Sequence, residues 1–267
     1  MNKPRFTIAA LAFVAGTLSA LAHDTWLAPD KFKVAPGSTV TLDMTSGMEF
    51  PKLDAAPKPE RVEAAKCRLS GETFDLERPT AAAKSLQFKT NLRQAGVATI
   101  WVKLAPRALE LKPDEVQHYL DEVDAPAPVR KEWHEMKEKR WRESYTKHTK
   151  TFVGVAEASA DRSWAEPIGA ALEIVPERDP ITVRAGEVLP VRVLKNGAPF
   201  PNFSINAVAE GETKGETQRT DSEGRVSFRL SKAGPWMVRG TDIRKSTAED
   251  VDWESDFATL TLDVAAK

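Results

Sequence analysis

The stretch VATIWVKL, residues 97–104, decides the fold, because apolar side chains recur in it at every second position. Ala98, Ile100, Val102 and Leu104 form one face of an extended strand. Two other stretches show the same alternation: STVTLDM at 38–44 and SLQFKTNL at 85–92. Short turns rich in glycine, proline and serine separate them. We therefore predict a β-sandwich from residue 23 to about residue 104.

The pattern changes between residues 107 and 150, where helical periodicity replaces alternation. KPDEVQHYLDEV, residues 112–123, predicts a short helix with a proline at its first turn. The charged stretch 129–150 predicts a longer helix, on which Trp141, Tyr145 and His148 share one face. We expect this face to pack on the sandwich and the charged remainder to face solvent.

Alternating strands return after residue 150 and continue to the end of the chain. TDSEGRVSFRL, residues 220–230, predicts a tight turn followed by a strand, and DFATLTLDV, residues 256–264, predicts a closing strand. The sequence therefore predicts a predominantly all-β fold of two immunoglobulin-like β-sandwich domains, residues 23–178 and 179–267. The helical segment, about 107–150, is expected between them or inserted in the first.

Residues 1–22 have the layout of a cleavable signal peptide. Lys3 and Arg5 precede an apolar run from Ile8 to Leu18, and small residues stand at Ala20 and Ala22. We expect cleavage after Ala22 and export to the periplasm. The apolar run is shorter than the about 20 residues that cross a bilayer, so no transmembrane segment is expected in the mature chain.

Composition and motifs exclude several functional classes. The chain of 267 residues balances 38 basic against 39 acidic side chains, for a net charge of -1, which argues against a nucleic-acid partner. Cys67 is the single cysteine, so no intramolecular disulfide can form. Its stretch VEAAKCRLSG predicts a strand, in which we expect Cys67 to be a small buried residue rather than a nucleophile. No nucleophile elbow, phosphate loop or zinc-hydrolase motif occurs, so we assign no catalytic residue and expect no enzyme.

An ordered set of short motifs resembles a bacterial exported family of unknown function that is labelled NikM-like, as a periplasmic component of nickel or cobalt uptake. The motifs, in chain order, are HDTWLAP, VTLDMTSGMEFP, VQHYLDEV, WRESYTKHTKTFVGV, LEIVPERDP, VRVLKNGAPFPN, TDSEGRVSFRL, AGPWMVRG and DWESDFATLTLDV. The resemblance implies a periplasmic β-sandwich protein with a mature His-Asp start. It also implies a role in metal uptake, with a membrane metal transporter as partner.

Cleavage after Ala22 would make His23 the first residue of the mature protein. The free amine and the imidazole of one residue then close a chelate ring on a late transition metal, here copper, nickel or cobalt. Asp24 would ligate the metal weakly or orient the imidazole. His148 is the preferred further ligand and His118 the next.

Two other hypotheses stay open on the sequence. One is a copper-dependent oxidase similar to lytic polysaccharide monooxygenases, which also use an N-terminal histidine on a β-sandwich. The other is a metal-free sandwich protein that binds a ligand or a protein partner. Our first hypothesis is a periplasmic, non-catalytic binding protein for a late transition metal.

Overall fold

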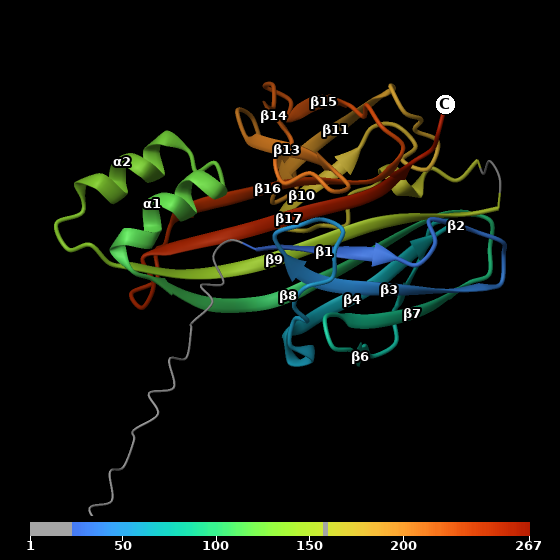
Figure 1. The fold of residues 1–267 in the computed structure, drawn as a ribbon, viewed down its shortest axis with the longest axis horizontal. Helices are drawn as coiled ribbons and strands as arrows, with labels where there is room; N and C mark the ends of the chain where they lie inside the picture. The colour runs from blue at the N-terminus through green and yellow to red at the C-terminus, as the bar shows by residue number, and fades with distance from the viewer. Residues whose placement is uncertain (1–22, 157–159) are drawn as a thin grey trace, which may run out of the picture.

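A computed structural model describes residues 23–156 and 160–267, so the predicted signal peptide and its cleavage point after Ala22 lie outside the described residues. A nine-stranded sheet forms the centre of the molecule (Figure 1). Its strands, in spatial order, are β14 (Glu216–Arg219), β13 (Ser204–Ala209), β16 (Gly234–Lys245), β17 (Trp253–Val264), β9 (Trp141–Val155), β8 (Gly96–Leu111), β4 (Val62–Leu69) and β5 (Glu72–Asp75), with β2 (Lys33–Val34) beside β9.

Two four-stranded sheets pack on opposite faces of this central sheet (Figure 1). The first contains β1 (Asp24–Pro29), β3 (Ser38–Gly47), β7 (Leu86–Leu92) and β6 (Thr80–Ala81). The second contains β10 (Leu172–Pro176), β11 (Val188–Lys195) and β12 (Ala198–Pro199), with β15 (Arg225–Arg229) beside β11. Short 3-10 turns are η1 (Pro59–Arg61) and η2 (Ser163–Ala165).

The alternation along β8 explains this layering. Ala98, Ile100, Val102 and Leu104 are buried in the core beneath the first small sheet, as the sequence predicted. Val97, on the other face of the same strand, belongs to the core beneath the second small sheet. The prediction of a predominantly β protein with two immunoglobulin-like β-sandwiches is therefore confirmed, and the two sandwiches share the central sheet.

Sheet pairing crosses the predicted division at residues 178 and 179. Strand β17 lies parallel to β9 and pairs with it from Trp253 opposite Glu143 to Thr261 opposite Thr151. The last strand of the chain is thus hydrogen-bonded to a strand of the first predicted domain. The exact domain boundary stays a prediction.

The two helices form a hairpin between β8 and β9, at one end of the central sheet (Figure 1). The predicted first helix is confirmed as α1 (Pro113–Glu122), with its proline in the first turn. The predicted helix over 129–150 is wrong in its second half, because α2 (Ala127–Glu135) ends early and Trp141 begins strand β9.

The correction has a physical reason in the pairing of β9. This strand is hydrogen-bonded to β8 on one side and to β17 on the other, so its backbone groups are satisfied by neighbours distant in sequence. Trp141 also stacks on Trp253, with ring centroids 4.7 Å apart. Local helix propensity is a weak preference that such contacts override.

Within residues 23–156 and 160–267, neither helix has the length and apolar character needed to cross a bilayer.

Candidate functional site

Strand β1 holds the start of the described chain in a fixed place. Thr259 Oγ1 donates a hydrogen bond to the carbonyl of Thr25 at 2.6 Å, and Thr261 Oγ1 donates one to that of Leu27 at 2.7 Å. Trp26 is fully buried between these contacts. The Lys147 ammonium group donates a hydrogen bond to the carbonyl of His23. The backbone at His23 is therefore positioned by the central sheet.

A cavity of about 230 Å³ opens beside His23. Its wall comes from β3, β8, β9, β17, helix α1 and the segment between β3 and β4. The basic side chains in this wall are Lys58, Arg61, Arg107 and Lys147, and the aromatic ones are Tyr119, Tyr145 and Phe257. We call this space the His23 cavity.

His23 is half-buried at the edge of this cavity. Burial lowers the pKa of its imidazole, and the nearby Lys147 charge lowers it further, whereas Asp54 and Asp24 act in the opposite direction. The net lowering favours the neutral ring at neutral pH. A neutral imidazole has a free nitrogen lone pair for a metal ion or a hydrogen bond.

Lys147 is the most unusual charged group of the site, because its side chain is only 8% exposed. The pKa of Lys147 is lowered to about 8, mainly by burial; Asp24 opposes this lowering, and the positive charges of Arg61 and Arg107 contribute to it. Its ammonium group lies 5.5 Å from the centre of the Tyr145 ring and 5.4 Å from that of Phe257. Aromatic faces thus supply part of the stabilisation that water would otherwise give.

Arg61 and Arg107 complete the basic wall. The Arg61 guanidinium lies 5.0 Å from the centre of the Tyr145 ring and donates to the carbonyl of Ala105 at 2.8 Å. Arg107 follows an irregularity in the pairing of β8 with β9, between Leu104 and Arg107, where Pro106 lacks the backbone N–H of a regular ladder. These basic residues and Lys147 come from three separate segments.

Sequence reasoning missed these three residues as site residues. The signal that could have indicated one of them is Pro106, which interrupts an otherwise regular strand and predicts a bulge there. No local motif connects Arg61 to Lys147, so their approach depends on how the strands pair.

Asp24 and His118 line a second, larger cavity of about 730 Å³. Asp24 forms an ion pair with Arg239, which already occupies one of its carboxylate oxygens. His118 is exposed on α1. Glu122 also lines this cavity, and burial raises the pKa of its carboxyl group. The structure therefore brings Asp24 and His118 to one cavity, while His23 lines the other.

His148 lies on the opposite face of β9 from Lys147, because successive side chains of a strand alternate. Its Nε2 is 3.0 Å from a carboxylate oxygen of Asp256, which also pairs with Arg244 at 2.8 Å. The expectation that His148 and Tyr145 share one face is wrong, since it assumed a helix. The structure does not bring His148 together with His23.

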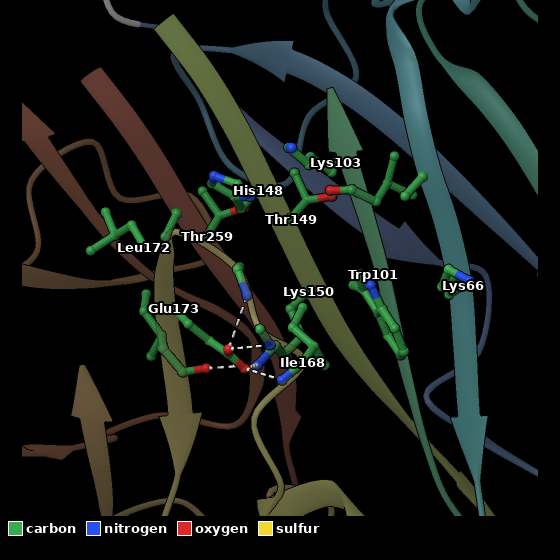
Figure 2. A pocket seen from close by; sticks show the side chains of 16 residues that line it. Lys66, Trp101, Lys103, His148, Thr149, Lys150, Ile168, Leu172, Glu173 and Thr259 are labelled. Carbon is green, nitrogen blue, oxygen red and sulfur yellow. Dashed lines mark hydrogen bonds and ion pairs between the residues drawn. The ribbon is translucent and has the colours of Figure 1, made fainter. Parts of the chain in front are cut away.

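His148 instead lines a cavity of about 230 Å³ on that other face (Figure 2). At one end of this cavity Lys150 pairs with Glu173 at 2.6 Å. Glu173 also accepts hydrogen bonds from the backbone N–H groups of Ile168 at 2.8 Å and Gly169 at 3.0 Å. The charges there are satisfied within the protein, which indicates a structural ion pair.

Cys67 is fully buried, as the sequence predicted, and burial raises the pKa of its thiol to about 12. Across residues 23–156 and 160–267, no three His, Cys, Asp or Glu side chains converge on a point where they could share a metal ion.

Comparison with known proteins gives a family and only distant structural likenesses. No curated protein matches the chain. The chain is similar to the D0-D1 domain of intimin (13% identity, 91% of this chain, 97% of that chain, TM-score 0.23). It is also similar to the Yersinia pseudotuberculosis adhesin InvE (13% identity, 91% of this chain, 59% of that chain, TM-score 0.24). A third likeness is to Escherichia coli alpha-2-macroglobulin spanning domains MG0-NIE-MG1 (11% identity, 89% of this chain, 94% of that chain, TM-score 0.23). Likenesses of this size identify no ligand, activity or partner for the chain.

The family assignment rests on a match that extends from the region just before β1 into β16. A family model described as Domain of unknown function (DUF4198) matches residues 20–241. This span contains His23, Asp24, all of the helical hairpin and every basic residue of the His23 cavity. Because the match covers most of its length, the chain belongs to the DUF4198 family.

Proposed function

We propose that this protein is an exported, non-catalytic binding protein that holds a late transition-metal ion through His23. The metal is copper, nickel or cobalt, and the recipient is a membrane metal transporter. The proposal joins the NikM-like resemblance of the sequence to one structural observation. That observation is that the residue predicted to start the mature chain lies at a fixed position on the edge of a cavity.

The chemistry of the proposed site follows from removal of residues 1–22. The new α-amine and the imidazole of His23 would together provide two nitrogen ligands, a donor set that favours copper over nickel and nickel over cobalt. Fixation of β1 on the central sheet supports this proposal, because it limits the motion that metal binding would have to arrest.

We propose His118 as the further metal ligand, ahead of Asp24 and His148. Asp24 forms an ion pair with Arg239, so we propose that it positions β1 and does not bind the metal. His118 is exposed on a helix that contributes to both cavities, so it is preferred over His148. His148 is engaged by Asp256 on the far face of the sheet.

Calorimetric titration with Cu(II), Ni(II) and Co(II) tests the proposal. The exported protein is first shown by mass spectrometry to begin at His23. It is compared with His23→Ala and with a form that carries one additional alanine before His23. We expect tight binding that both altered forms lose, because each lacks the chelate ring of amine and imidazole.

Matched variants locate any third ligand. His118→Ala is expected to weaken binding and His148→Ala to leave it unchanged, with circular dichroism as the check on folding. Equal metal binding by the native, extended and His23→Ala proteins would refute the proposal, and so would an absence of binding to all three metals.

A further inference from the structure

We propose that the His23 cavity binds a small organic anion through a carboxylate group. The inference goes beyond metal binding and does not depend on it. It rests on an accumulation of positive charge that the protein leaves unpaired, in a cavity that also has apolar and aromatic walls.

The basic residues of this cavity lack the carboxylate partners that similar residues have elsewhere in the molecule. Across the described ranges, Arg61, Arg107 and Lys147 form no ion pair with an acidic side chain. The comparable buried lysine on the opposite face of β9, Lys150, pairs with Glu173 at 2.6 Å. Lys147 is the buried member of this group, and a buried charge is costly unless it is paired, so an anion in the His23 cavity would balance it.

The hydrogen-bonding capacity of these groups is also incompletely used. The ammonium group of Lys147 donates to the carbonyl of His23, and no other acceptor for it occurs in the described part of the chain. Arg61 Nε is buried without a hydrogen-bond partner there. Arg107 has no side-chain hydrogen bond within the same ranges. A bound carboxylate would accept hydrogen bonds from such donors, and charge-assisted bonds of this kind are among the stronger ones in proteins.

Acidic side chains near the site do not remove this excess of positive charge. Asp24 attracts Lys147 at longer range, but it forms its own ion pair with Arg239. Glu122 acts on Lys147 from the wall of the larger cavity. Asp54 acts on His23. Glu143 also acts on Lys147, but its carboxylate accepts hydrogen bonds from Tyr119, Trp141 and Ser255. None of the four lines the His23 cavity.

The remaining wall indicates the class of anion. Tyr119, Tyr145, Phe257, Leu109 and Pro57 present aromatic and aliphatic surface to the cavity. Inorganic phosphate has no apolar part to bury against such surface, whereas an organic carboxylate does. The volume of about 230 Å³ limits the ligand to a small molecule.

The test is calorimetric titration with benzoate, succinate and inorganic phosphate. The protein is the exported chain, freed of metal on a chelating resin and kept at low ionic strength. We expect benzoate or succinate to bind and phosphate to bind at least about tenfold more weakly. Arg107→Gln is expected to weaken carboxylate binding about tenfold, the effect of losing one charge-assisted hydrogen bond.

Arg107 is suited to this substitution because it is exposed, so the fold should tolerate the change. Lys147→Met is the second variant and should weaken binding further. Arg78→Gln is the matched control, since Arg78 is also exposed and lies outside the cavity, and it should bind as the native protein does. Failure of both carboxylates to bind would overturn the inference. Equal affinity for phosphate, or native affinity in both Arg107→Gln and Lys147→Met, would also overturn it.

The same titrations separate this inference from the proposed metal site. His23→Ala removes the imidazole and should abolish metal binding while benzoate or succinate still binds. Arg107→Gln should weaken carboxylate binding and leave metal affinity within about twofold in the absence of carboxylate. Each proposal can therefore fail without the other.

Discussion

Lys147 and Lys150 stand three positions apart on β9 and are both almost completely buried, at 8% and 5% exposure. Their surroundings differ, since Lys150 contacts Glu173 and Lys147 contacts a backbone carbonyl and two aromatic rings. Alternation on the strand directs them to opposite faces. Lys150 therefore stabilises the fold through its ion pair, whereas the burial of the Lys147 charge lowers the free energy of unfolding.

Replacement of Lys147 by methionine should stabilise the protein at neutral pH. The folded state lowers the pKa of Lys147 from 10.5 to about 8, so the unfolded chain binds more protons between these pH values and native stability rises with pH across them. Below pH 8 the substitution removes the full free-energy cost of holding the charged lysine in the folded state. The expected gain in stability is at most about 3 kcal/mol, reduced by the contribution of the lost hydrogen bond. Urea unfolding at pH 7 and at pH 10.5 measures it.

We expect the gain in Lys147→Met at pH 7 and only about 0.4 kcal/mol of it at pH 10.5, where the folded-state lysine is neutral and the unfolded-state lysine is half-protonated. The matched variant is Lys150→Met. It should lose about 3–5 kcal/mol at pH 7, because Glu173 would remain buried without its cation. A loss of stability in Lys147→Met at pH 7 equal to that of Lys150→Met would contradict this account.

At the scale of elements, the helical hairpin matters because α1 contributes Tyr119 to the His23 cavity. Arg130 of α2 closes the hairpin. It donates to the carbonyls of Leu120 at 2.7 Å and Ala125 at 2.8 Å, and it pairs with Asp121. The carbonyl of Leu120 also accepts a hydrogen bond from the backbone N–H of Ala125, and Ala125 lies in the turn between the helices, so Arg130 connects the last turn of α1 and this turn to α2.

Arg130→Leu should therefore loosen the hairpin. We expect a loss of about 1–3 kcal/mol in unfolding free energy, since two carbonyl partners and one ion pair disappear together. Amide hydrogen exchange in α1 should become faster. Lys131→Leu is the control on the same helix, because Lys131 is exposed and only pairs with Glu135 at 3.8 Å. Equal exchange rates in the two variants would show that Arg130 does not hold α1 in place.

At the scale of the whole molecule, the central sheet joins the parts that the sequence suggested as separate domains. Strand β17 pairs with β9 over a long parallel register and with β16 over its whole length. Separation of the two sandwiches would expose the backbone groups of β9 and β17 and the stacked Trp141 and Trp253.

We therefore expect the chain to unfold in one cooperative transition. Far-ultraviolet circular dichroism reports the strands, and tryptophan fluorescence reports the cores, so their midpoints in urea should coincide. Two separated transitions would mean that the sandwiches unfold independently in spite of the shared sheet. The measurement needs the same protein concentration and metal-free buffer for both signals.

The sequence by itself determined the predominance of strands, the short helix at α1 and the burial of Cys67. Alternation along β8 and the proline that starts α1 are local signals, and local signals survive in any tertiary context that does not oppose them. The tertiary structure decided that Trp141–Val155 is a strand, because β8 and β17 pair with its backbone. It also decided that His148 faces away from His23 and that Arg61, Arg107 and Lys147 meet at one cavity. Such convergence depends on strand order and register, which bring together residues far apart in the chain and leave no periodic trace in the sequence.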